Sequence, residues 1–328
     1  MTDSDKAIVY LGSDFEKYRQ TLNLAIHSNE PYLEQINRYV LGGRGKEIRP
    51  VLSLLVGRCC GNLNAESFYC AAAAEMLHTA TLMHDDVVDE ACMRRGHLTV
   101  SSKYSPGAAV LTGDFWLSRA LAILTANCKQ ENILNFAKAV QQMSEGELLQ
   151  LQKAENLDTT EQEYYSIIFG KTAALFLASL KSSASAVGAD AATIDAVSVY
   201  AENIGMAFQI RDDVLDYSLH LKTGKPAGAD IKERKLTLPL LGAMQQNEQL
   251  AKHILSDIKR IGGVEKLQED EIVKKVIEFV HAHNGIEYAQ SKLESFISLA
   301  IRALESLPAC REKEMLKNYA IYIGERSK

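Results

Sequence analysis

The sequence predicts an all-α protein that forms a single domain over residues 1–328. Helix breakers are scarce, with 6 prolines and 20 glycines among 328 residues. Little of the chain shows the alternation of apolar and polar residues that is typical of half-buried strands. The hydrophobic content of 47% is enough for a large core. No linker or low-complexity segment indicates a domain boundary.

The N-terminal part of the chain predicts packing helices followed by a loop. Within residues 1–40, apolar side chains recur at helical intervals, namely at Leu22, Ile26, Leu33, Ile36 and Val40. The glycine-rich, basic segment 42–50 then predicts a loop that leads into a helix, because Pro50 suits a first helical turn. After Asn64 a long run without glycine or proline, rich in Ala, Leu and Met, predicts a helix that reaches about residue 89.

The remainder of the chain also predicts helices. Residues 106–128 and 131–153 are further helical runs, and Lys171 opens an apolar run. Residues 223–230 form a turn-rich segment, after which a helix begins near Pro239. Near the C-terminus, apolar residues at three-four spacing predict an amphipathic helix that packs on the rest of the domain.

Composition limits the possible function classes. The net charge of −6 argues against broad nucleic-acid binding, which requires a basic face. The six cysteines show no Cys-x-x-Cys spacing and are expected to be reduced thiols. The N-terminus lacks the order of a signal peptide, and no uninterrupted apolar run approaches the roughly 18 residues of a membrane span. We expect a cytoplasmic protein, with peripheral membrane contact left open.

Three carboxylates lie together at the end of the predicted helix that follows Asn64. Asp85 and Asp89 are four residues apart and therefore lie on one side of a helix, with Asp86 at the edge. The carboxylates repel one another, and the negative end of the helix dipole disfavours anions. We therefore expect a cation at this helix end.

The same Asp-Asp-x-x-Asp spacing recurs at Asp212, Asp213 and Asp216. A single acidic cluster is more often a solvated surface. Two copies embedded among apolar residues favour metal binding instead. Carboxylate oxygens suit Mg²⁺, which prefers a few carboxylates together with waters and substrate phosphates. The sequence therefore predicts a phosphorylated substrate held through Mg²⁺.

These motifs, with Arg94-Arg95-Gly96 after the first and Phe208-Gln209 before the second, resemble those of the trans-polyprenyl diphosphate synthases. The long-chain members of octaprenyl type are the most similar, and the resemblance runs from about Gly42 to Pro239. It implies an isoprenoid-synthase helical bundle around a central cavity, and a homodimer. It also implies a Mg²⁺-dependent prenyltransferase with three ions per active site. Such an enzyme condenses isopentenyl diphosphate with an allylic diphosphate, here for quinone side chains.

The resemblance also assigns roles to individual residues. All six aspartates would bind metal. The residues that would bind isopentenyl diphosphate are Lys46, Arg49, His78 and Arg95. Those around the allylic diphosphate would be Arg94, Lys171, Thr172, Gln209, Lys225 and Lys235. Arg326 matches a terminal basic residue that some relatives fold over the substrate. The chain departs from many relatives at Glu47, at Arg234 and after Gly96, where a common proline is absent.

Product length is predicted from the residues one turn below Asp85. Thr81 and Ala80 precede Asp85 by four and five residues, and one turn descends about 5.4 Å. Both are small where short-chain relatives carry aromatic residues, which predicts an open tunnel and a long product. The alternative is that Ala80 and Thr81 only pack helices together.

The motifs leave three other functions open. A short-chain synthase of geranylgeranyl or farnesyl type would share the motifs. A class I terpene cyclase would share the fold and the first motif, but it generally carries an Asn-Ser-Glu type of second motif. A non-catalytic subunit of a synthase would not need both motifs intact.

Overall fold

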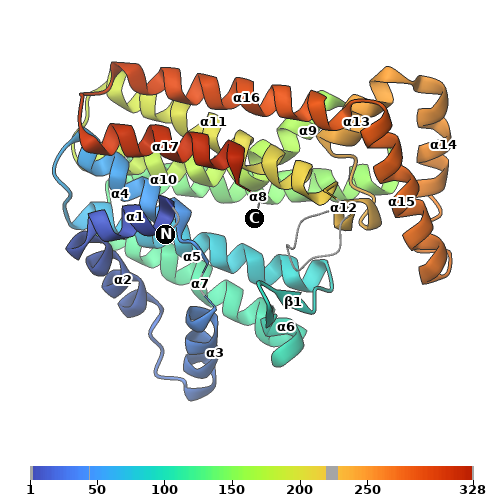
Figure 1. The fold of residues 1–328 in the computed structure, drawn as a ribbon. Coiled ribbons are helices and arrows are strands. Elements are labelled where there is room, and N and C mark those ends of the chain that lie inside the picture. Colours follow the sequence, from blue (N-terminus) through green and yellow to red (C-terminus); the bar gives the residue numbers. More distant parts are fainter. Residues whose placement is uncertain (1–2, 44, 219–227, 327–328) are drawn as a thin grey trace. The chain divides into compact units, whose positions relative to one another are not determined.

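The computed structural model describes residues 3–43, 45–218 and 228–326. These residues are almost entirely helical, which confirms the predicted all-α class (Figure 1). The described strands form one short hairpin. Contacts within the chain define two compact units that are interleaved in the sequence, and each is described by itself below. The single domain over residues 1–328 stays a prediction.

Unit 1 comprises Met1–Val140, Leu175–Ala201 and Ala303–Tyr319. Its elements before residue 130 are α1 (Asp3–Leu11), α2 (Ser13–Ile26), α3 (Pro31–Gly42), α4 (Ile48–Cys60), α5 (Ala65–Val88), β1 (Met93–Arg94), β2 (His97–Leu98), α6 (Val100–Lys103) and α7 (Pro106–Asn127). It also holds all but the first residue of α10 (Ala174–Ala186), the 3₁₀ turn η2 (Leu304–Ser306), and parts of α8 (Gln130–Asn156), α11 (Ala191–Asp216) and α17 (Arg311–Glu325).

Unit 2 comprises Gln141–Ala174, Glu202–Arg302 and Ala320–Lys328. It holds the remaining parts of α8, α11 and α17, together with α9 (Glu161–Ile168), the π-helical turn η1 (Phe169–Ala173), α12 (Ala229–Lys232), α13 (Leu238–Gln246), α14 (Glu248–Ile258), α15 (Lys266–Ala282) and most of α16 (Gly285–Ala303).

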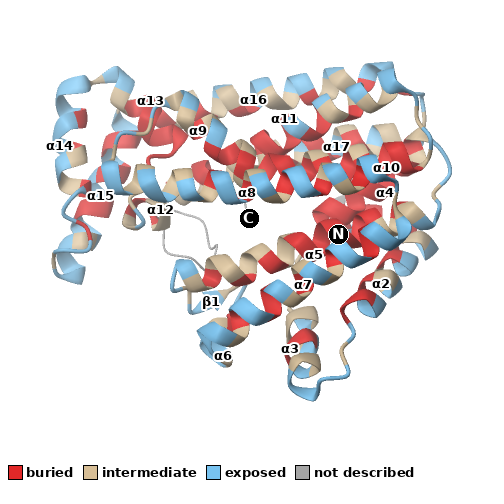
Figure 2. Cartoon of the chain, turned by 180° about the vertical axis from the view of Figure 1, so that it is seen from behind, coloured by how far each residue is buried: buried red, intermediate tan, exposed pale blue. Residues whose placement is uncertain are grey.

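Helix α5 begins and packs as its sequence predicts. Asn64 caps it by accepting a hydrogen bond from the backbone N–H of Ser67, whose side chain reaches back to the N–H of Asn64. Four successive alanines, residues 71–74, are fully buried, so neighbouring helices approach α5 closely. Helix α7 runs alongside α5, and buried residues lie along both (Figures 1 and 2). Trp116 of α7 donates to the side chain of Asn37 at 2.8 Å and thereby ties α3 to this pair.

The π-helical turn η1 lies between two helices at positions where side chains would not fit. A Cβ added to Gly170 would lie 2.5 Å from the carbonyl oxygen of Gln142 on α8. A Cβ added to Gly205 on α11 would lie 2.4 Å from the Cα of Ala173. Since real Cβ atoms do not approach so closely, glycine at both positions allows α8, η1 and α11 to touch through their backbones. This contact places Lys171 and Thr172 beside α8 and α11.

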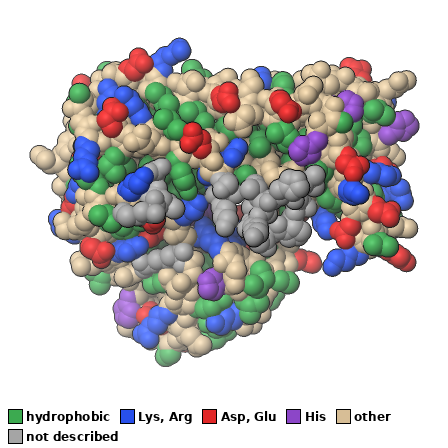
Figure 3. Space-filling view, viewed as in Figure 1, with side chains coloured by type: hydrophobic (Ala, Val, Ile, Leu, Met, Phe, Trp, Pro, Cys, Tyr) green, Lys and Arg blue, Asp and Glu red, His purple; other side chains and the backbone are tan. Residues whose placement is uncertain are grey.

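Two described helical stretches are long and apolar enough to cross a membrane, judged by length and composition alone. Glu161–Ala186 is mostly buried, as expected of a core helix. In Pro106–Asn127, which is α7, only 33% of the most apolar 18-residue window is buried, and Val110, Leu111 and Leu121 are exposed on the helix. On the face drawn in Figure 3, positively and negatively charged side chains are interspersed.

Candidate active site

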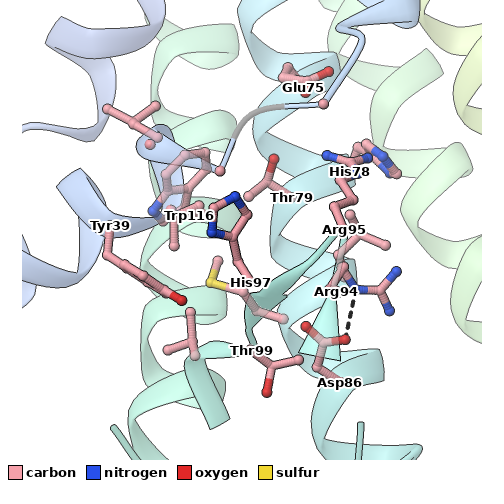
Figure 4. Close-up of a pocket in the computed structure, with 18 of the residues that line it drawn as sticks. Tyr39, Glu75, His78, Thr79, Asp86, Arg94, Arg95, His97, Thr99 and Trp116 are labelled. Atoms are coloured by element: carbon pink, nitrogen blue, oxygen red, sulfur yellow. Dashed lines mark hydrogen bonds and ion pairs between the residues drawn. The ribbon is translucent and has the colours of Figure 1, made fainter. Parts of the chain in front are cut away.

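The first aspartate motif lies at the C-terminal end of α5, where its carboxylates differ in environment. Asp86 is buried, and the Nε of Arg94 donates to its Oδ1 at 2.7 Å (Figure 4). Asp85 is half-buried and Asp89, the cap residue of the helix, is exposed. Arg94 therefore supplies a cation at this helix end. Asp85 and Asp89 are more accessible to water than Asp86.

The hairpin that follows α5 directs the two arginines. Met93 pairs with Leu98 and Arg94 pairs with His97, so Arg95 and Gly96 form a two-residue turn. Both turn residues have positive φ, at 52° and 80°, which is the pattern of a type I′ turn. An added Cβ at Gly45 would lie 2.2 Å from Nη1 of Arg95, so the guanidinium rests against the glycine-rich loop before α4.

A cavity of about 380 Å³ lies inside unit 1 between α3, α5, the hairpin and α7. His78, Arg94 and Arg95 line one side of it, whereas Tyr39, Trp116 and several aliphatic side chains make the rest largely apolar (Figure 4). The pKa of His78 lies well below its usual value, because the imidazole is removed from water and because the charges of Arg49, Arg95 and Arg94 oppose a further positive charge. His78 is therefore neutral at physiological pH.

The start of α4 places its charged residues in three different surroundings. Arg49 is buried, with its guanidinium 4.5 Å from the centre of the Phe176 ring. Lys46 is exposed, and its carbonyl oxygen accepts a hydrogen bond from Ser4. Glu47 has a positive φ of 48° and is buried.

Two donors on α2 satisfy the carboxylate of Glu47. The hydroxyl of Tyr18 donates to it at 3.0 Å and the guanidinium of Arg19 at 2.7 Å. The negative charge of Glu47 in this loop is therefore paired inside the protein.

Each aspartate of the second motif is held by a different partner within unit 2. Arg326 donates to Asp212 at 2.7 Å, and the guanidinium also lies over the ring of Phe208. Tyr164 donates to Oδ2 of Asp213 at 2.6 Å, and Gln209 donates to Oδ1 at 2.9 Å. The carboxylate of Asp216 accepts two backbone N–H groups at the start of α12, from residues 229 and 230, at 3.1 and 3.0 Å.

Burial dominates the electrostatics of this motif. The pKa of Asp213 is raised to about 6 because the carboxyl is buried, and the charges of Asp212 and Asp216 act in the same direction. The hydrogen bonds from Tyr164 and Gln209 favour the charged form and oppose this rise. A bound cation would therefore stabilise these carboxylates in their charged form.

Lys171 and Thr172 extend from η1 toward α8 and α11 respectively. The Nζ of Lys171 donates to Glu147 at 2.8 Å, and Gln150 donates to the other oxygen of Glu147 at 2.7 Å. Thr172 donates to the side-chain oxygen of Gln209 at 2.7 Å. Gln209 and Thr172 are thus linked to Asp213 by a short hydrogen-bonded chain.

The predicted site residues therefore form two groups, one in each unit. His78, Arg49, Arg94 and Arg95 influence one another beside Asp86 in unit 1. The second motif gathers with Thr172, Gln209 and Arg326 in unit 2, and Lys235, half-buried, pairs there with Glu233. Lys225 lies outside the described residues. Ala80 is fully buried, and Thr81 donates to the carbonyl oxygen of His78 at 3.0 Å.

The donor set of the two motifs fits Mg²⁺. In the described residues no three His, Cys, Asp or Glu side chains form a ready metal cage. Carboxylates at partly or fully exposed positions of a helix end, as at Asp85 and Asp89, are the kind of ligand that Mg²⁺ uses together with waters and substrate phosphates. The metal role of the six aspartates stays a prediction.

Two residues of this site did not emerge from the sequence. These are Glu147, which holds Lys171, and Tyr164, which holds Asp213. The one available signal for Tyr164 is its place on the helical stretch that carries Lys171, eight residues before Thr172. A hydrogen bond to Asp213, 49 residues away along the chain, has no local signature.

Comparison with known proteins agrees with this fold. Residues 30–280 match the family model described as polyprenyl synthetase. The chain is 36% identical over 317 residues to the octaprenyl diphosphate synthase of Haemophilus influenzae, covering 96% of this chain and 94% of the relative. It is 35% identical to the all-trans-nonaprenyl-diphosphate synthase (geranyl-diphosphate specific) of Rhodobacter capsulatus, covering 94% of this chain and 93% of the relative.

Solved structures give the same result. The crystal structure of a decaprenyl diphosphate synthase from Rhodobacter capsulatus matches with a TM-score of 0.92 and 32% sequence identity over 99% of both chains. The helical fold and the two aspartate motifs define the protein as an all-α prenyltransferase. The chain belongs to the polyprenyl synthetase family.

Proposed function

We propose that this protein is a long-chain trans-polyprenyl diphosphate synthase that adds isopentenyl diphosphate units to an allylic prenyl diphosphate. The observation that carries the proposal is the near full-length similarity to an octaprenyl and a nonaprenyl synthase. The acidic end of α5, with Arg94 and Arg95 directed by the hairpin, gives that similarity a chemical basis. Its product would supply quinone side chains.

We propose that Mg²⁺, three ions per active site, binds at the two aspartate motifs. Asp85 and Asp89 of the first motif, and Asp212 of the second, offer carboxylate oxygens at partly or fully exposed positions. The metal would neutralise diphosphate charge and thereby assist departure of the leaving group. Arg326, already beside Asp212, would limit repulsion among the carboxylates of the second motif.

The allylic diphosphate would be held by basic side chains that are already oriented. Arg94 uses one N–H group on Asp86, and a guanidinium carries five donors, so others can reach a phosphate. Lys171 is held by Glu147, and an ammonium can donate three hydrogen bonds. Lys225 and Lys235 would complete this set. Together these cations stabilise the negative charge that develops on the diphosphate as the carbon–oxygen bond breaks.

Isopentenyl diphosphate would be held by Lys46, Arg49, His78 and Arg95. Neutral His78 can donate one hydrogen bond to a phosphate oxygen without adding charge. The double bond of this substrate then attacks the allylic cation, a carbon–carbon bond forms, and a proton is lost to the released pyrophosphate. No protein nucleophile takes part in this sequence.

The direct test is turnover by the purified protein with Mg²⁺, isopentenyl diphosphate and each allylic primer in turn. We expect release of pyrophosphate and long prenyl products, identified by chromatography after removal of the diphosphate. Asp85→Ala should abolish turnover at every Mg²⁺ concentration, because it removes an oxygen ligand at the end of α5. Normal turnover by this variant would exclude the metal role, and an inactive wild-type protein would support a non-catalytic subunit.

We propose that small side chains below Asp85 allow a long product. Ala80 and Thr81 would let the growing hydrocarbon pass along α5. Replacing Ala80 with Phe should shorten the product by several isoprene units, measured on the same chromatogram. Ala74→Phe, on the same helix at a fully buried position further from Asp85, tests whether the blocked length grows with depth. An unchanged product length with Ala80→Phe would mean that this residue only packs helices.

We also propose a cytoplasmic homodimer that contacts membranes only peripherally when it releases its product. The exposed apolar residues of α7 support an interface on this helix, since they cost free energy when left in water. The described cysteines are free thiols, which suits a reducing compartment.

A further inference from the structure

We propose that Tyr164 is a positioning residue for the second aspartate motif and that it acts by holding the carboxylate of Asp213. This inference rests on the metal-dependent function proposed above. Tyr164 lies on α9, outside both aspartate motifs and outside the Lys171-Thr172 pair. Its hydroxyl nevertheless makes the shorter of the two hydrogen bonds that Tyr164 and Gln209 donate to Asp213, at 2.6 Å against 2.9 Å.

The geometry of this contact is that of a strong, directed hydrogen bond. Tyr164 is 3% exposed and Asp213 is also 3% exposed, so little water competes for either group. Oxygen–oxygen distances of about 2.5 to 2.7 Å are typical of hydroxyl groups that donate to carboxylates. Inside a protein such a bond is electrostatically stronger than in water.

Both oxygens of Asp213 are held, and from different elements. Tyr164 of α9 donates to Oδ2, whereas Gln209 of α11 donates to Oδ1. The amide of Gln209 is itself oriented, because its oxygen accepts the hydroxyl of Thr172 from η1. Hydrogen bonds on both oxygens leave the carboxylate one orientation, and each oxygen retains a lone pair for a further partner.

Tyr164 donates to Oδ2 of Asp213, which the partners of the other two aspartates do not do. Asp212 is held by Arg326 and Asp216 by backbone N–H groups, and neither of these partners donates to Asp213. Loss of the tyrosine hydroxyl would remove the donor to Oδ2 of a buried carboxylate. The carboxylate could then turn about its side-chain bond, and the motif would lose its preset arrangement for cations.

The neighbouring Tyr165 provides a matched control. It lies on the same helix and its hydroxyl also donates to a carboxylate, that of Glu161, at 2.9 Å. Its ring contacts Phe296, and Glu161 belongs to neither aspartate motif. Tyr164→Phe and Tyr165→Phe therefore each remove one hydroxyl from α9, but only the first removes a donor to the second motif.

The experiment compares the wild-type protein with these two variants by three measurements. These are the Mg²⁺ concentration for half-maximal turnover, Mn²⁺ binding in the presence of inorganic pyrophosphate by electron paramagnetic resonance, and the melting temperature in EDTA. For Tyr164→Phe we expect the metal affinity to fall by about 10-fold to 100-fold, the range seen when such oriented partners of metal ligands are lost. The Mg²⁺ concentration for half-maximal turnover should rise by the same factor. Tyr165→Phe should match the wild type in both metal measurements.

A double-mutant cycle with Asp213→Ala tests whether Tyr164 acts through Asp213. In the Asp213→Ala background, removing the Tyr164 hydroxyl should change Mn²⁺ binding by less than about twofold, because its acceptor is gone. Equal metal binding by Tyr164→Phe and wild type would overturn the inference, as would a full effect in the Asp213→Ala background. Wild-type protein that neither turns over nor binds Mn²⁺ with pyrophosphate would instead refute the proposed function.

Discussion

Glu47 shows how one buried charge can be tolerated beside a basic loop. Its backbone has a positive φ, which turns the side chain inward at the start of α4, where Tyr18 and Arg19 donate to it. A buried carboxylate without such donors would be costly. Because Arg19 keeps part of its surface exposed, the pair sits at the edge of the protein interior. In this loop Glu47 is therefore buried, whereas the neighbouring Lys46 is exposed.

His78 gives the protein a defined sensitivity to acid. Its pKa is lowered in the folded protein by removal from water and by three arginines, whereas an unfolded histidine titrates near pH 6.5. Below that pH the unfolded state binds a proton that the folded state does not, so stability is lost as pH falls. We expect His78→Asn to lose less unfolding free energy than the wild type between pH 7.5 and pH 5.0.

Urea unfolding at the two pH values measures this difference. His253→Asn is the control, since His253 is exposed on α14 and its replacement also removes one imidazole. If His78→Asn and wild type lose the same free energy on acidification, the environment of His78 does not destabilise its charged form.

At the scale of elements, backbone contact between α8, η1 and α11 determines where the unit 2 residues of the site lie. Gly146 and Gly170 bring α8 against η1, and Gly205 brings α11 against Ala173. Small residues at helix contacts permit close approach because no side chain separates the backbones. Lys171 then reaches Glu147 on one neighbour while Thr172 reaches Gln209 on the other.

Gly170→Ala should separate these helices. The new Cβ would lie 2.5 Å from a backbone carbonyl oxygen, which cannot move away as a flexible side chain could. We expect a loss of about 1–3 kcal/mol in unfolding free energy, the usual cost of overpacking, and reduced turnover. Gly107→Ala is the control, because no atom lies within 4 Å of its added Cβ. Denaturant unfolding measures the stability of both variants. If Gly170→Ala is as stable as Gly107→Ala, the close contact at Gly170 is contradicted.

Sequence reasoning predicted those elements whose causes are local. The start of α5 after Asn64 depends on residues that are close together in the sequence. The same is true of the two Asp-Asp-x-x-Asp motifs. The hairpin could not be predicted, because Arg95-Gly96 is not the Asn-Gly or Asp-Gly pair that signals a type I′ turn. The Tyr164–Asp213 contact could not be predicted from the sequence either, since it depends on how α9 packs against α11.

At the scale of the whole molecule, helix α7 is apolar and yet carries exposed apolar side chains. Val110 and Leu121 are eleven residues apart on α7 and so lie within about 20° of one another around a regular helix. Both are exposed, and so is Leu111 at 70%, which lies about 100° further around the helix from Val110, so the three form a broad apolar strip. Exposed apolar residues that share a helix face indicate a partner, and a second copy of the chain is the partner we propose.

Leu111→Glu should weaken the proposed homodimer, because it would bury a charge in an apolar interface. We expect a shift from dimer to monomer in sedimentation velocity at micromolar concentration. Leu267→Glu is the control, since Leu267 is 73% exposed on α15, a helix of unit 2. A dimer that survives Leu111→Glu unchanged would mean that this part of α7 is not the interface.

The π-helical turn also sets the rotational phase of the helix that contains it. Residues eight apart on a regular α-helix differ by about 80° in direction, so Tyr164 and Thr172 would then point to different neighbours. A π turn accommodates one extra residue, and residues eight apart then behave like residues seven apart, which differ by only about 20°. Tyr164 and Thr172 can therefore both reach the stretch of α11 that holds Gln209 and Asp213. Deleting a single residue from this turn would leave the composition nearly unchanged and still rotate Tyr164 away from Asp213.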